Sequence, residues 1–346
     1  MSSYKIKKKG NTKLKIEYDE ETAMAFLDEN VRSDLVIEYT EQFYNSSEQK
    51  GKRMSGVEMK ESAETSYGIK VTDVQITNED GERSIGKPIG QYITVEAVSL
   101  PGGDDDYHQA VTGVLMAQLR KLLPDIENQK VLVAGIGNRD ITPDALGPLV
   151  AELLLITRHL FEQYGKNSDI VRGLGNVSAV IPGVMAQTGM ETAEILHGLV
   201  REIRPDVLIA IDALAARSIR RLVTTIQLTD TGIHPGAGIG NRRYCLTKEV
   251  LGIPVIAIGM PTVIDAATIV ADTMESLIGV LNKSPVLQKA VRATEEFDHE
   301  EKYLLMRELM EPQMTNLFVT PKDIDEAVSR ISYTISEAIN SLCHHV

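Results

Sequence analysis

The sequence predicts an α/β fold with a mostly parallel central sheet and helices on both of its faces. Short, uninterrupted apolar runs recur in the second half of the chain, and segments with helical spacing of apolar residues separate them. Uninterrupted apolar runs are typical of parallel strands that are buried on both faces, and their alternation with helices predicts a sheet covered by helices. The composition agrees, because 43% of the 346 residues are hydrophobic and 25% are charged, as in ordinary globular proteins.

The central strands are predicted at five apolar runs. They lie at residues 131–136, 177–181, 207–211, 224–228 and 253–258. Helical spacing predicts helices between and after these runs, at residues 143–164, 191–203, 262–281, 295–309 and, beginning after Pro321, 322–342. The chain is therefore expected to end in a helical region.

A smaller, β-containing N-terminal portion precedes this core. Residues 69–76 and 92–98 alternate apolar and polar side chains, which predicts two strands. The cluster Asn78–Gly81 between them carries turn signals. Helical spacing begins near Tyr107, whereas residues 41–66 are polar and predict a loop. We therefore divide the chain into residues 1–34, a strand-and-helix portion at 35–125, and an α/β core with C-terminal helices at 126–346.

Charge and cysteine content exclude several classes of protein. Acidic residues outnumber basic ones 49 to 36, and the net charge of −13 argues against binding nucleic acid through the phosphate backbone. The chain has 2 cysteines, which cannot form a disulfide framework and fit a reducing compartment. The longest apolar stretch, residues 253–270, is interrupted by Pro254, Pro261 and Asp265, so we expect a cytoplasmic protein without a membrane span.

Residues 1–34 differ from the rest because their charges stand in blocks. Lysines crowd the stretch from Lys5 to Lys15, and acidic residues crowd the stretch from Glu17 to Glu21. A charged terminus of this kind is commonly a solvated arm. A pro-segment is the competing interpretation.

The first candidate for a functional acid is Asp144. In open α/β sheets, ligands bind beyond the carboxyl ends of the strands, and Asp144 follows the run at 131–136. Thr142 is a candidate N-cap and Pro143 suits the first helical position, which puts Asp144 in the first helical turn. An acid there often only complements the helix dipole, so the spacing leaves a structural and a functional role open.

The second candidate is Asp212, which comes directly after the apolar run at 207–211. Its carboxylate is expected to be partly desolvated, and it then needs a partner or a shifted pKa. Because both strands end at one edge of the sheet, Asp212 and Asp144 can approach each other. A carboxylate pair can activate a water with one acid and donate a proton with the other. Bonding to loop amides is the structural alternative, and Asp230 and Asp265 compete because they also follow apolar runs.

Other catalytic signatures fit less well. Residues 81–88 have the glycine and lysine spacing of a phosphate loop, but Pro88 replaces the hydroxyl that would hold Mg²⁺. The glycine-rich residues 236–240 do not follow a clear strand, and neither a G-x-S-x-G nor an H-E-x-x-H motif is present. We expect no cofactor and no resident metal.

Several motifs closely resemble those of the germination protease (spore protease) family of endospore-forming bacteria. They are Gly135–Pro148 (GIGNRDITPDALGP), Ile181–Thr192 (IPGVMAQTGMET), Ile211–Ser218 (IDALAARS), Thr224–Asn241 (TTIQLTDTGIHPGAGIGN), Leu251–Gly259 (LGIPVIAIG) and Val319–Lys322 (VTPK). The resemblance runs from about Val31 to the C-terminus. More distantly, the glycine-rich motif and the acids that follow it are similar to the hydrogenase-maturation endopeptidases, from which we carry over the fold and the two acids but not the nickel.

The resemblance implies a zymogen endopeptidase that starts the degradation of small acid-soluble spore proteins during germination. It implies a homotetramer in the forespore or spore core. The family cleaves after an acidic residue and before an apolar one, and residues 31–38 (VRSDLVIE) look like that motif built into the enzyme. We therefore predict self-processing between Asp34 and Leu35, which makes residues 1–34 a pro-segment.

The resemblance also implies an atypical aspartic peptidase, with Asp144 and Asp212 as the pair. Asn138 and His234 are candidate orienting or oxyanion groups, and Arg217 belongs to a set of arginines that could bind the acidic surroundings of the cleavage site. One alternative is a metal-dependent peptidase or amidohydrolase that uses Asp144, Asp212 and His234 as ligands. Another is a non-catalytic binding protein in which the carboxylates are only structural caps.

Overall fold

The computed structural model describes residues 4–9, 13–18, 33–45, 54–62, 65–233, 245–282 and 317–345. The chain divides into two compact units, one of Ser33–Ile269 with Asn316–Val346 and one of Met1–Arg32 with Val270–Thr315. In the second unit, β1 (Tyr4–Lys9) and β2 (Lys13–Tyr18) form an antiparallel hairpin. The first unit carries the sheet and both candidate acids.

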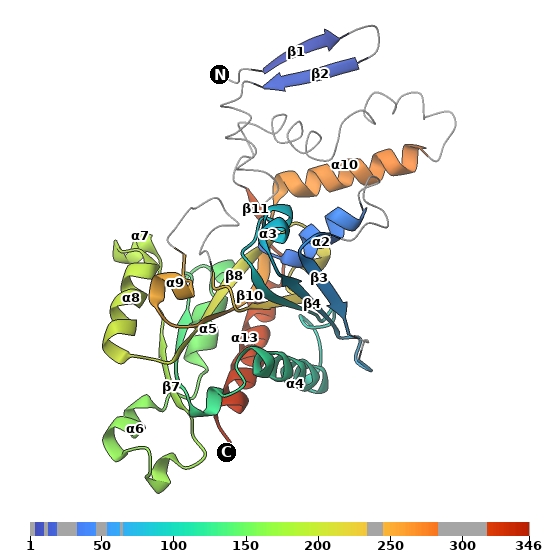
Figure 1. Cartoon of the computed structure of the whole chain (residues 1–346). Coiled ribbons are helices and arrows are strands. Elements are labelled where there is room, and N and C mark those ends of the chain that lie inside the picture. The colour runs from blue at the N-terminus through green and yellow to red at the C-terminus, as the bar shows by residue number, and fades with distance from the viewer. Residues whose placement is uncertain are drawn as a thin grey trace. The chain divides into compact units, whose positions relative to one another are not determined.

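The described part of this unit contains a nine-stranded mixed sheet (Figure 1). Its order is β3-β4-β5-β9-β10-β8-β6-β7, and β11 also pairs with β10. The strands are β3 (Val57–Glu61), β4 (Lys70–Ile76), β5 (Gly90–Glu96), β6 (Lys130–Gly135), β7 (Asn176–Val180), β8 (Val207–Ala216), β9 (Thr225–Thr229), β10 (Val255–Asp265) and β11 (Phe318–Val319). The neighbours β10, β8, β6 and β7 run parallel, whereas β3, β4, β5 and β9 pair antiparallel. The α/β class is confirmed, with a parallel half that carries both acids.

Helices cover both faces of the sheet, as the apolar runs predict. On one face, α4 (Asp105–Leu122), α5 (Leu146–Glu152) and α13 (Ile324–Cys343) pack around a core that includes Leu115, Val150 and Ile335. On the other face, α8 (Thr192–Ile203) and α9 (Lys248–Leu251) contribute Leu196 and Leu251 to a second cluster. The predicted helical C-terminus is α13. The helix predicted at 295–309 lies outside the described residues.

The loop predicted at 41–66 is wrong in part. Residues 36–45 form α2 (Val36–Asn45), and β3 is the edge strand of the sheet. The residues of β3 are mostly exposed and charged, because an edge strand faces water and charge discourages pairing with other chains. The predicted turn at 78–81 is instead the start of α3 (Glu79–Ile85), where the Asn78 Oδ1 accepts hydrogen bonds from two backbone N–H groups at the N-cap.

The single helix predicted at 143–164 is three short segments. They are the 3-10 turn η2 (Thr142–Asp144), α5 and α6 (Arg158–Tyr164). The helix is interrupted between α5 and α6 because two backbone N–H groups donate elsewhere: that of Leu155 to Asn340 Oδ1 at 2.9 Å and that of Thr157 to the Val177 carbonyl at 3.0 Å. The predicted N-cap at Thr142 is also wrong, because Ile141 is the N-cap of η2 and Thr142 is already its first residue.

Two central strands continue further than their apolar runs predict. β8 reaches Ala216, and β10 continues to Asp265, so α10 (Ala266–Asn282) begins four residues later than the helix predicted from 262. Short segments complete the described chain: η1 (Ile126–Asn128), η3 (Asp169–Val171), α7 (Met185–Thr188) and η4 (Ile219–Arg221). None of the helices in the described ranges is long and apolar enough to cross a membrane.

Candidate active site

Asp144 lies at the end of η2, directly after β6 and before α5. Its Oδ2 accepts a hydrogen bond from the Asn138 N–H at 2.7 Å, so the carboxylate closes the loop that follows β6. This closure requires glycine at position 137, where φ is +117° and a Cβ would lie 2.0 Å from the Asp144 carbonyl oxygen. The GIGN motif therefore lets the backbone pass close beneath Asp144.

Asp212 lies inside β8, and not after its end as the sequence predicts. Its residue is 5% exposed, and its Oδ1 accepts the Ala213 N–H at 2.9 Å. β6 ends at Gly135, opposite Ile211, whereas β8 runs on for five further residues. Asp212 is thus the first β8 residue beyond the end of its neighbour, which leaves this side of the strand open to another chain segment.

The chain segments that carry the two acids contact each other. η2 contacts both β8 and β10. The Thr262 hydroxyl of β10 donates to the Pro143 carbonyl at 2.6 Å, and the Ile136 N–H donates to the Ile211 carbonyl at 2.8 Å. The structure therefore brings the loop bearing Asp144 and the strand bearing Asp212 to one part of the sheet.

The competing acids have structural contacts of their own. Asp230 follows β9, which runs antiparallel to β10, so it lies at the other end of the parallel half. Its Oδ1 accepts the Gln91 N–H at 2.8 Å, which fastens the start of β5. Asp265 ends β10 and accepts a hydrogen bond from the Thr268 hydroxyl at 3.3 Å.

Residues 33–38 lie against the extension of β8. The Asp34 N–H donates to the Ala215 carbonyl at 3.1 Å, and the Ala215 N–H donates back to Asp34 Oδ2 at 2.8 Å. Leu35 is fully buried in the apolar cluster that includes Leu214 and Ile233. The chain's own Asp34–Leu35 bond is therefore held three β8 residues, about 10 Å along a strand, beyond Asp212.

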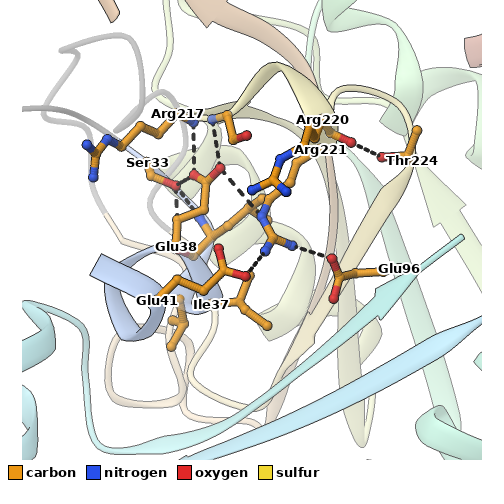
Figure 2. Close-up of polar contacts among 12 residues, drawn as sticks. Ser33, Ile37, Glu38, Glu41, Glu96, Arg217, Arg220, Arg221 and Thr224 are labelled. Atoms are coloured by element: carbon orange, nitrogen blue, oxygen red, sulfur yellow. Dashed lines mark hydrogen bonds and ion pairs between the residues drawn. The ribbon is translucent and has the colours of Figure 1, made fainter. Parts of the chain in front are cut away.

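The carboxylate of Glu38, in the first turn of α2, lies in a binding site formed by hydrogen-bond donors and an arginine (Figure 2). Its oxygens accept the backbone N–H groups of Arg217 at 2.9 Å and Ser218 at 2.8 Å, and the Ser33 hydroxyl also donates to it. The buried Arg221 guanidinium lies 3.7 Å from the carboxylate. Burial raises the pKa of Glu38, and the hydrogen bonds and Arg221 act in the opposite direction.

Nothing in the local sequence separates Arg221 from the other arginines. Its guanidinium forms ion pairs with Glu41 at 2.6 Å and Glu96 at 2.9 Å as well as with Glu38. Arg217, which was singled out, binds Glu38 through its backbone N–H, and Figure 2 shows its side chain directed away from that carboxylate. The spacing between Glu38 and Arg221 is too long for any local motif to reveal the pair.

The remaining candidates have different outcomes. Asn138 contacts Asp144 through its backbone N–H. Its side-chain Oδ1 accepts the Gln187 amide at 2.9 Å and the Asp140 N–H at 3.0 Å. His234 and the glycines at 236–240 lie outside the described residues. Across the ranges that are described, no group of three or more His, Cys, Asp or Glu could hold a metal ion.

A chain segment is bound to the strand that carries Asp212, and the loop that carries Asp144 contacts the same strand. This is the arrangement expected of a peptidase. The sequence model of the germination protease family matches residues 33–293, beginning at the first residue of the segment held against β8. The germination protease of Caldanaerobacter subterraneus subsp. tengcongensis is 45% identical over 315 residues, covering 90% of this chain and 93% of that protein. Those of Clostridium tetani (42%, covering 90% and 94%) and Bacillus velezensis (39%, covering 91% and 93%) are similar over comparable lengths.

The chain belongs to the germination protease family. It is therefore an endopeptidase, a hydrolase that acts on protein. Family membership removes the alternative of a non-catalytic binding protein.

Proposed function

We propose that this protein is a zymogen endopeptidase that removes its own residues 1–34 and then starts the degradation of small acid-soluble spore proteins during germination. Cleavage falls between Asp34 and Leu35. Asp144 and Asp212 activate the water. The protein works as a homotetramer in the forespore or spore core, and light scattering is expected to give a molecular mass near four times that of the chain.

The observation that carries the proposal is the binding of residues 33–38 to the sheet. Three residues of this segment make separate contacts with the sheet unit. Asp34 binds Ala215, Leu35 lies in an apolar cluster, and Glu38 lies beside Arg221. This pattern of acid, apolar residue and acid is the cleavage motif that the sequence resembles. The segment also lies on the strand that carries Asp212.

The chemistry follows from two carboxyl groups in different protonation states. One is ionised and takes a proton from water, whose oxygen bonds to the carbonyl carbon of residue 34. The other is protonated, donates a hydrogen bond to the carbonyl oxygen and supplies the proton for the nitrogen of Leu35 when the C–N bond breaks. Neighbouring carboxyl groups titrate as a pair, so the two roles belong to the pair.

N-terminal sequencing and intact mass after incubation at mildly acidic pH test the proposal. The wild-type chain is expected to begin at Leu35, and Asp144→Asn and Asp212→Asn each to slow processing by about 10²-fold to 10⁴-fold because general acid–base catalysis contributes that much. Asp230→Asn is the matched control, since asparagine keeps an oxygen that can accept the Gln91 N–H. A new N-terminus at another residue contradicts the processing site, and unimpaired processing in both single variants contradicts the aspartate pair.

A further inference from the structure

Gln227 of β9 binds the backbone on both sides of the Asp34–Leu35 bond. Its Nε2 donates to the Asp34 carbonyl oxygen at 3.1 Å, and its Oε1 accepts the Val36 N–H at 2.8 Å. These partners fix the orientation of the amide, because a carbonyl only accepts and a backbone N–H only donates. Gln227 is 7% exposed, so a buried side chain is committed to these two contacts.

The sheet register connects Gln227 to Asp212. Asp212 lies opposite Gly259 of β10, and Gly259 lies opposite Gln227 of β9. Residues in one row across a sheet project to the same face, and two strand spacings are about 10 Å. Asp212 and Gln227 therefore flank Gly259 on the face that buries Leu35.

We propose that Gln227 contacts the substrate during self-processing, polarising the carbonyl of the Asp34–Leu35 bond and receiving the negative charge that develops on its oxygen. This inference rests on the proposed processing site. When the water oxygen bonds to the carbonyl carbon, the C=O electron pair moves to the oxygen that faces Nε2. When the C–N bond breaks, the charge leaves that oxygen and the Leu35 nitrogen takes a proton.

The oxygen and the nitrogen of the Gln227 side-chain amide have different roles. Oε1 holds Val36 in place on the leaving side of the bond, and this contact orients the peptide in the ground state. Nε2 faces the oxygen whose charge grows only as the bond is attacked, and such donors accelerate the reaction because they bind the transition state more tightly than the substrate. Both contacts are to backbone, so they do not depend on the side chains at residues 34 and 36.

Gln227→Glu separates these duties, because a carboxylate still accepts the Val36 N–H but cannot donate to the Asp34 carbonyl. We expect single-turnover self-processing at neutral pH to slow about 100-fold, as on loss of one oxyanion donor. Hydrogen exchange of the Val36 amide is expected to stay protected. Gln227→Met, which removes both groups at similar volume, should lose processing and protection together.

Gln118→Glu is the matched control, since Gln118 is 8% exposed and its Oε1 accepts a hydrogen bond from Lys121 that a carboxylate retains. It should process at the wild-type rate. If wild type is cut at Asp34–Leu35 and folded Gln227→Glu or Gln227→Met is cut within about 3-fold of that rate, far less than the loss of an oxyanion donor, the inference is wrong while the processing site stands. If wild type is not cut there, the proposed function fails and the inference fails with it.

Discussion

Replacing Arg221 with methionine should destabilise the protein strongly, because this arginine balances three carboxylates. The guanidinium side chain is 5% exposed, and the side chain of its closest buried partner, Glu38, is 4% exposed. Methionine keeps an apolar stem of similar length and removes the charge. Glu38 is then left buried without its cation, although the N–H groups of Arg217 and Ser218 still donate to it.

The size of the effect follows from burial. Removing one partner of a buried ion pair costs about 3–5 kcal/mol, whereas the pairs with the more exposed Glu41 and Glu96 add only about 0–1 kcal/mol each. The unit that carries these residues has about 270 residues, and unfolding entropy near 2.1 cal/mol/K per residue makes 1 kcal/mol worth about 2 °C. The total is about 3–7 kcal/mol, so we expect Arg221→Met to lower the Tm by about 5–12 °C near neutral pH.

The loss should depend on pH in a defined direction. Burial raises the pKa of Glu38 above its usual 4.5, so the folded protein holds this proton more tightly than the unfolded chain. The contribution of Glu38 to stability therefore falls as pH rises through the interval above 4.5. Arg221 lowers that pKa, and its removal widens the interval, so the cost of Arg221→Met should be largest at pH 8 and smaller towards pH 5.

Thermal unfolding of wild type, Arg221→Met, Glu38→Gln and the double variant at both pH values measures these quantities. Adding Glu38→Gln to Arg221→Met should recover most of the loss, because an amide carries no charge to leave unpaired. Arg220→Met is the matched control, since Arg220 is exposed and should change stability by no more than about 0.5 kcal/mol. Equal Tm values for Arg221→Met and Arg220→Met, or no recovery in the double variant, would refute the reasoning.

Three other predictions can be tested on the same protein. Gly147→Ala should cost about 3 kcal/mol in urea unfolding, because its Cβ would lie 2.4 Å from the Ile136 carbonyl oxygen, whereas Gly113→Ala in α4, where a Cβ meets nothing within 4 Å, should stabilise by up to about 1 kcal/mol. Burial raises the pKa of the Cys343 thiol to about 12, so thiol reagents at pH 8 should leave it unlabelled until the protein unfolds. Processing would turn the buried Leu35 N–H into a charged amino group in an apolar cluster, so hydrogen exchange in α2 should increase after cleavage.

Sequence patterns predicted the elements that are buried on both faces and missed those decided by partners elsewhere. The runs at 131–136 and 207–211 became β6 and the first half of β8 because uninterrupted apolar side chains fit the middle of a covered sheet. β3 was missed because an edge strand exposes charged side chains and shows no apolar alternation. Residues 213–216 (ALAA) are all apolar, a pattern that fits either a helix or a strand, and they are strand because they pair with β10.

In the candidate site, too, local sequence patterns predicted some residues and missed those that depend on distant partners. Asp144 and Asp212 could be singled out because each follows an apolar run in the sequence, although Asp212 lies inside β8. Gln227 could not, because it lies in a predicted core strand that also holds Thr224 and Thr225, where a polar residue is as easily a hydrogen-bonded core residue as a functional one.

Glu38 and Arg221 are 183 positions apart, and only the order of the strands brings them together. β8 extends beyond the end of β6, so its exposed edge can bind Asp34. The residues after β8 bind Glu38, four positions after Asp34, through the backbone N–H groups of Arg217 and Ser218 and the guanidinium of Arg221. The sequence of residues 33–38 therefore shows which segment is bound. The site that binds this segment forms because β8 is longer than β6, and no local sequence pattern predicts the relative lengths of two strands.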